Sequence, residues 1–204
     1  VIDRLSNEYR SSFKEVITQP QTGKHLGFEA HQFLLNSVND EYDFYCYLED
    51  DLVINDPLFF KKLFYFNSKF NQEFVLLPQR VEFSCQPHMV DRFYVDGPIE
   101  EIERRKAISD PATSIYLDIY GDKIHFVSPE NPHAGCFFLT KDQLLTWSKE
   151  DYWMDRDSSF ISPLESAASL GIAKTFKLYK TKFETAAWFE IQHWGNSYHS
   201  LIGT

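Results

Sequence analysis

The sequence has few cysteines, little positive charge and no long apolar run. Its three cysteines lie far apart without a CxxC pair, which predicts reduced thiols and a cytoplasmic protein. No apolar run approaches the roughly 18 residues of a membrane-spanning helix, so we expect no transmembrane segment. The formal net charge of −10 disfavours nucleic acid as a partner, because this protein would repel a phosphate backbone.

Basic residues gather only in two short runs, ERRK at 103–106 and KLYKTK at 177–182. We expect both runs on solvated faces, with a small patch for a phosphate-bearing ligand as the alternative. Aromatic residues, by contrast, make up 17% of the chain. They predict a thick core and offer stacking surfaces.

Strand and helix patterns alternate along the first half of the chain. The pattern predicts strands at 15–19, 43–49 and 73–83, the last interrupted at Pro78, with helices over 24–38 and from Asp56-Pro57 to about Phe70. Such alternation favours an α/β fold with a mainly parallel central sheet and helices on its faces.

The second half adds a small antiparallel region. SIYLDIYGDKIHFV at 114–127 predicts a hairpin that turns at Gly121-Asp122. Further elements are a charged helix near 99–107, a strand over 133–140, a helix over 141–150, a helix from Ser162 that ends at Gly171, and a strand over 173–180. No repeat or linker is visible, so we treat residues 1–204 as one domain.

Three consecutive acids, Glu49, Asp50 and Asp51, follow the predicted core strand. Side chains alternate along a strand, so Glu49 and Asp51 share one side. Ligands bind beyond the carboxyl ends of strands in open α/β sheets, where two carboxylates can hold a divalent cation. The alternative is a solvated strand end with an Asx-type turn.

The stretch GKHLGFEAHQFLLNSVNDEYDFYCYLEDDLVI, residues 23–54, resembles the GT-A glycosyltransferases, whose DxD-type motif is here spelled EDD. It looks most like the N-acetylglucosaminyltransferase I type, and the resemblance covers roughly residues 15–195. It implies a GT-A-like fold, a Mn²⁺ (or Mg²⁺) cofactor, a UDP- or GDP-linked sugar donor, and a glycan or other hydroxyl-bearing acceptor.

The resemblance also implies roles for single residues. Asp51 would bind the metal together with His193 in FEIQHWGNSY, although packing between Trp188 and Trp194 explains that histidine equally well. The donor would contact residues of the triplet and of NPHAGCFFLT, namely Glu49, Asp50, His133 and Gly135, although a plain core strand also explains the latter stretch.

The same family carries an acidic residue beside the acceptor, and SPLESAASLGI resembles that stretch. Glu165 would then be the base of an inverting reaction, with Asp155 and Asp157 as the next candidates. A helix dipole alone also favours a carboxylate at this position. Trp153 offers a stacking face to a sugar acceptor.

The sequence departs from the family at its start. Only 48 residues precede Glu49, so we expect the first nucleotide-binding strand to be missing or reduced to VIDRL. Two other functions stay open. One is a metal-dependent hydrolase, although no HxH, DxH or HExxH pair is present, and the other is a non-catalytic carbohydrate- or partner-binding domain on a GT-A scaffold.

Overall fold

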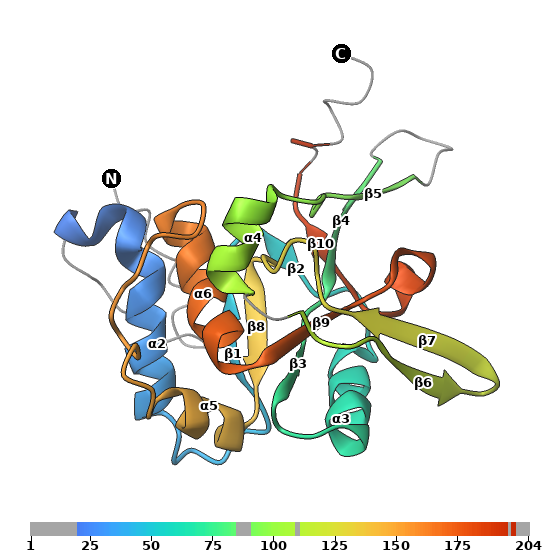
Figure 1. Ribbon diagram of the computed structural model, residues 1–204, viewed down its shortest axis with the longest axis horizontal. Coiled ribbons are helices and arrows are strands. Elements are labelled where there is room, and N and C mark those ends of the chain that lie inside the picture. Colours follow the sequence, from blue (N-terminus) through green and yellow to red (C-terminus); the bar gives the residue numbers. More distant parts are fainter. Residues whose placement is uncertain (1–19, 85–90, 109–110, 196, 199–204) are drawn as a thin grey trace, which may run out of the picture.

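The computed structural model describes residues 20–84, 91–108, 111–195 and 197–198. Its helices are η1 (Pro20–His25), α2 (Leu26–Asn36), α3 (Phe59–Lys69), α4 (Glu101–Ala107), α5 (Lys141–Trp147), α6 (Pro163–Thr175) and η2 (Phe183–Trp188). Figure 1 shows α2, α5 and α6 together on one side of the strands and α3 on the other. The strand predicted at 15–19 lies outside the described residues.

The strands form three groups. They are β1 (Tyr45–Leu48), β2 (Leu52–Val53), β3 (Phe74–Leu76), β4 (Gln79–Phe83), β5 (Arg92–Tyr94), β6 (Ile115–Ile119), β7 (Asp122–Val127), β8 (Cys136–Leu139), β9 (Lys177–Thr181) and β10 (Glu190–His193). β1 pairs with β8, a second sheet has the order β2-β10-β4-β5, and a third has the order β3-β9-β7-β6.

The α/β class and the hairpin are confirmed, but the prediction of a mainly parallel sheet is wrong. Among the described strands, β3–β9 and β4–β10 pair in parallel, while the β1–β8, β2–β10, β4–β5, β6–β7 and β7–β9 pairs are antiparallel. Pro78 divides the predicted strand 73–83 into β3 and β4, which join different sheets. β4 then pairs with β5 in an antiparallel way instead of continuing through a helical crossover.

α3 starts later than predicted, at Phe59, and has no side-chain cap, so the prediction of a start at Asp56-Pro57 is wrong. The Asp56 side chain instead accepts a hydrogen bond from the Leu58 backbone N–H at 2.8 Å in the turn before the helix. Ser162 caps α6 through the Leu164 N–H, with Pro163 as the first helical residue, as predicted. Gly171 does not end α6, so that prediction is wrong.

Aromatic rings join the sheets into one large core. Phe59 stacks on Phe189 with ring centroids 4.4 Å apart and meets Phe138 of β8 edge-on at 5.0 Å. Phe66 meets Phe126 of β7 at 5.2 Å. α3 therefore packs against all three strand groups and fixes the strands whose ends carry the candidate site. Within the described residues, no helix has both the length and the apolar character needed to cross a membrane.

Candidate functional site

The acidic triplet forms a tight turn between two strands. The Leu52 N–H donates to the Glu49 carbonyl at 3.2 Å, so the chain leaves β1 and enters β2 within four residues. The Glu49 side chain is 9% exposed and that of Asp51 is 45% exposed, while Asp50 is exposed. The turn thus directs Glu49 inward, Asp51 along the edge of the site, and Asp50 toward solvent.

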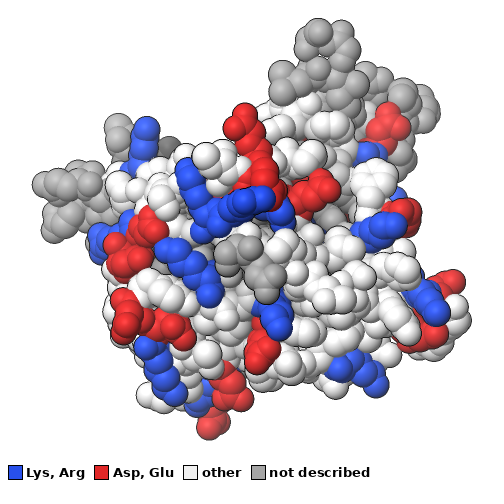
Figure 2. Space-filling model, viewed as in Figure 1, with Lys and Arg blue, Asp and Glu red and all other residues white. Residues whose placement is uncertain are grey.

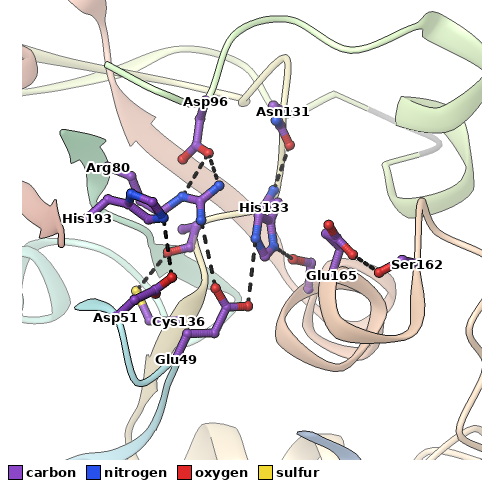
Figure 3. Close-up of polar contacts among 12 residues, drawn as sticks. Glu49, Asp51, Arg80, Asp96, Asn131, His133, Cys136, Ser162, Glu165 and His193 are labelled. Atoms are coloured by element: carbon purple, nitrogen blue, oxygen red, sulfur yellow. Dashed lines mark hydrogen bonds and ion pairs between the residues drawn. The ribbon is translucent and has the colours of Figure 1, made fainter. Parts of the chain in front are cut away.

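Asp51 lies beside His193 at the end of β10 (Figure 3). The Oδ2 atom of Asp51 is 3.3 Å from the Nε2 atom of His193. This proximity follows from the sheet, because β10 pairs with β2 and places His193 opposite Leu52. The Trp194 N–H also donates to the Asp51 carbonyl. The other carboxylate atom, Asp51 Oδ1, is buried and has no hydrogen-bond partner among the residues that the structure describes.

The second ring nitrogen of His193 contacts a buried carboxylate. His193 Nδ1 is 3.0 Å from Oε1 of Glu82, which lies on β4 and is 0% exposed. The Tyr198 N–H donates to both oxygens of Glu82, at 3.2 and 3.1 Å. A carboxylate can only accept a hydrogen bond, so Nδ1 is the donor toward Glu82, and Nε2 is the ring nitrogen turned toward Asp51. A carboxylate oxygen and a ring nitrogen 3.3 Å apart can share a proton or bind one cation together.

The Glu49 side chain points into the protein and is nearly buried there. Its Oε2 lies 3.8 Å from Arg80 Nη1, and its Oε1 lies 3.8 Å from His133 Nε2. Oε1 is buried, and no described residue forms a hydrogen bond with it. Burial raises the pKa of Glu49 to about 7, against the opposing effect of Arg80, and the Asp51 carboxylate adds to the rise.

Gly135 makes room for Glu49. Gly135 has a φ of +63°, and a Cβ built there would lie 2.6 Å from Glu49 Oε2. The Glu49 N–H also donates to the Gly135 carbonyl at 2.9 Å. The sequence suggested that this glycine allows close approach of a donor sugar. In the structure, the Glu49 carboxylate lies in that space.

Arg80, Asp96 and Lys180 form a buried ion network next to Glu49. Asp96 Oδ1 accepts hydrogen bonds from Arg80 at 2.9 and 2.6 Å, and Asp96 Oδ2 accepts one from Lys180 at 2.9 Å. Lys180 also donates to the His133 carbonyl at 2.6 Å. Burial alone would raise the pKa of Asp96, but Lys180 and Arg80 bring it below its ordinary value. The network ties β4, β9 and the segment before β8 together.

His133 is 5% exposed, and its Nδ1 lies 3.2 Å from the Ser169 hydroxyl of α6. Burial, together with the nearby Arg80, lowers the pKa of His133 to about 3, so the ring is neutral at physiological pH. The predicted contact of His133 with a donor stays a prediction. The structure shows a buried imidazole between Glu49 and α6.

Glu165 lies in the first turn of α6 and is half-buried. Its carboxylate accepts a short hydrogen bond from Ser162, the residue that caps the helix. In Figure 3, Glu165 lies on the same side of the site as His133. Its charge also contributes to the raised pKa of Glu49. The structure therefore brings Glu165 to the same end of the molecule as the triplet.

The remaining candidates lie elsewhere. Asp157 pairs with Lys174, in the last turn of α6, at 2.8 Å, and its N–H donates to Asp155 at 2.9 Å. Asp155 and Asp157 help to line a small hollow beside Trp147. Trp153 packs edge-on against Trp147, with ring centroids 4.6 Å apart. The structure does not bring these three residues together with Asp51.

The sequence analysis missed several buried charges that surround the site. The missed residues are Arg80, Glu82, Asp96 and Lys180. One signal was available in QRVEF, where Arg80 and Glu82 alternate with apolar residues of a core strand. Charges at alternating strand positions point to one face, and charges inside a core need partners.

The two basic runs do not form a free cationic surface. In the first run, Arg104 and Arg105 pair with Glu101, and Lys106 pairs with Glu103. In the second, Lys177 pairs with Glu73, Lys180 with Asp96 and Lys182 with Glu184. Figure 2 shows acidic and basic side chains intermingled on one face, with large uncharged areas between them. The exclusion of nucleic acid stays a prediction that these pairings favour.

Within the described ranges, no three His, Cys, Asp or Glu side chains converge as a complete metal site. Asp51 and His193 offer two ligand atoms that face one another. No protein-family model, no curated protein and no solved structure matches this chain. The site's own geometry therefore carries the functional argument.

Proposed function

We propose that this chain is a metal-dependent glycosyltransferase that moves a sugar from a nucleotide-diphosphate donor to an acceptor hydroxyl. The observation that carries the proposal is the pair formed by Asp51 Oδ2 and His193 Nε2, 3.3 Å apart beside the EDD turn. The resemblance of residues 23–54 to GT-A enzymes suggests which reaction such a pair serves.

The pair fits a divalent cation. Asp51 Oδ1 is also buried without a hydrogen-bond partner among the described residues, and His193 turns its Nε2 toward Asp51. Carboxylate and imidazole together suit Mn²⁺ better than Mg²⁺. Two protein ligands leave the other positions to diphosphate oxygens and water. When bound, the metal would neutralise charge on the departing nucleoside diphosphate.

Glu165 is our candidate for the base of an inverting transfer. Its carboxylate would accept the proton of the acceptor hydroxyl while that oxygen bonds to the anomeric carbon and the bond to the diphosphate breaks. The hydrogen bond from Ser162 and the first turn of α6 hold the carboxylate in place. A retaining enzyme would not need this base.

The other residues of the turn have different accessibility. Asp50 is exposed and free to approach the hydroxyls of a donor. Glu49 faces inward, between Arg80 and Gly135, so it fixes the turn that presents Asp51. We therefore assign Asp50 to donor contact and Glu49 mainly to support of the turn.

The proposal is tested by calorimetric binding of UDP and GDP, with and without Mn²⁺ or Mg²⁺. We expect metal-dependent nucleotide binding in the wild type and its loss in Asp51→Ala. Asp43→Ala removes an exposed carboxylate just before β1, at the opposite end from the triplet, and should bind as the wild type does. Absence of nucleotide binding with either metal would contradict the proposal.

Further assays on the same protein distinguish the transferase from a carbohydrate-binding domain and from a hydrolase. Glycan binding without nucleotide binding would indicate a carbohydrate-binding domain on this scaffold. Release of free sugar from a bound UDP-sugar at an unchanged rate when acceptors are added would indicate a hydrolase that uses water. Transfer to an added acceptor, detected by mass spectrometry, supports the transferase.

A further inference from the structure

We infer that Glu82 is a positioning residue, which fixes the ring of His193 with Nδ1–H toward itself and Nε2 toward Asp51. The inference rests on the proposed function for its chemical purpose. Its geometry stands on three contacts, namely His193 Nδ1 to Glu82 Oε1 at 3.0 Å and the two hydrogen bonds from the Tyr198 N–H.

The sheet explains why Glu82 reaches this histidine. β10 runs parallel to β4, with Gln192 opposite Val81, so the next residues along the two strands are His193 and Glu82. Both side chains therefore point to the same face of the sheet, the one that meets the acidic turn. Gln192 and Val81 point to the opposite face and line a separate groove there.

Glu82 is itself buried and hydrogen-bonded. It is 0% exposed, and the Tyr198 N–H anchors both of its oxygens. The Tyr198 ring also meets the His193 ring edge-on, with centroids 5.6 Å apart. A carboxylate anchored in this way restricts both the orientation and the tautomer of the imidazole that donates to it.

This restraint affects how well His193 can act as a ligand. A carboxylate that accepts from the other nitrogen of a metal-binding imidazole fixes the ring and raises its basicity, and its loss typically costs about 10- to 100-fold in metal affinity. We expect a loss of that size for Mn²⁺ binding in Glu82→Gln. Glu82 acts through His193, so the double variant Glu82→Gln/His193→Ala should bind no more weakly than His193→Ala.

The test is a titration with Mn²⁺, with and without UDP, followed by the electron paramagnetic resonance signal of free Mn²⁺. Glu190→Gln is the matched control, because Glu190 lies on β10 like His193 but accepts from the Tyr94 hydroxyl and pairs with Arg92 instead. A Mn²⁺ affinity of Glu82→Gln equal to that of the wild type would overturn the inference. So would a loss of affinity from Glu82→Gln that is equally large when His193 has already been replaced by alanine. If Glu82→Gln does not fold, Glu82→Asp replaces it, since a carboxylate shorter by one methylene should also weaken Mn²⁺ binding.

A second measurement separates this inference from the proposed function. Nitrogen-15 NMR of the His193 ring in the metal-free protein should show the Nδ1–H tautomer, and Glu82→Gln should lose that preference. If this result appears while the wild type binds no Mn²⁺, the proposed function fails and the positioning role stands. A neutral ring with its proton on Nε2 and none on Nδ1 overturns the positioning role whatever the metal does.

Discussion

The Glu49 carboxylate lies in the space where a side chain at residue 135 would begin. A Cβ built on Gly135 would meet Glu49 Oε2 at 2.6 Å and Leu52 Cδ1 at 3.0 Å. β1 and β8 are paired so that Leu48 lies opposite Cys136, which places the residues after β1 next to those before β8. The strand register thus makes glycine necessary at position 135 for the acidic turn to close.

We predict that Gly135→Ala lowers the free energy of unfolding by about 2–5 kcal/mol. A left-handed backbone costs a non-glycine residue about 1–2 kcal/mol, and overpacking adds about 1–3 kcal/mol. Gly121→Ala is the control, because Gly121 has a φ of +91° but nothing within 4 Å of its Cβ position. Urea unfolding of both variants measures the difference, and equal losses would show that Glu49 moves aside without cost.

Glu165→Gln tests the proposed base. Loss of a general base typically reduces the rate by about 100- to 10,000-fold, so we expect a fall of that size in kcat. Binding of Mn²⁺ and UDP should not change, because Glu165 contacts Ser162 and not the Asp51–His193 pair. Glu101→Gln alters another glutamate in the first turn of a helix and should leave kcat unchanged. An unchanged kcat in Glu165→Gln would show that Glu165 is not the base.

We predict that protonation of the buried His31 lowers the free energy of unfolding at acidic pH. Burial among aromatic rings lowers the pKa of His31 to about 4, against the opposing hydrogen bond to the Ala167 carbonyl. The folded pKa is below the unfolded value near 6.5, so this stability is present above pH 6.5 and is lost as pH falls toward 4. Between pH 7 and pH 5, the loss due to His31 should be about 2 kcal/mol.

The measurement compares unfolding free energies at pH 7 and pH 5 in the wild type and in His31→Gln. The variant loses ring packing at both pH values, but it should lack the acid-dependent component that His31 contributes. Other buried histidines, such as His133, are present in both proteins and cancel in the comparison. The same pH dependence in both proteins would contradict the prediction.

Local features of the fold were predictable from the sequence, and strand pairing was not. The hairpin over 114–127 turns at Tyr120 and Gly121, both with positive φ, close to the predicted turn. Ser162 and Pro163 start α6 as predicted, because capping depends on neighbouring residues. Which strands pair depends on contacts far along the chain, and alternation alone wrongly suggested parallel neighbours.

The candidate site was predicted in part for the same reason. Asp51 and His193 were named from motifs, and the structure brings them together. Glu82 was missed, because a single glutamate in a strand pattern does not show that it is fully buried against a distant histidine. Trp153 was proposed as a stacking face, and the structure shows it partly exposed and in contact with the rings of His31 and Trp147, which the sequence alone does not show.

Gly171 shows how packing can reverse a local preference. Gly often ends a helix, but α6 continues to Thr175, and Gly171 lies against the Trp147 ring. In an exposed helix, Gly171→Ala would stabilise by about 1 kcal/mol. Here the added Cβ would lie 2.7 Å from Trp147 Cε2, and overpacking of about 1–3 kcal/mol should outweigh that gain and leave a net destabilisation of up to about 2 kcal/mol.

A double-mutant cycle identifies the cause of that loss. Trp147→Phe removes the part of the indole that meets Gly171, so Gly171→Ala should cost less in that background than in the wild type. Urea unfolding of the four proteins gives the coupling energy, which we expect to be at least about 1 kcal/mol. Additive losses would mean that the methyl group is accommodated elsewhere and that Trp147 does not select glycine at this position.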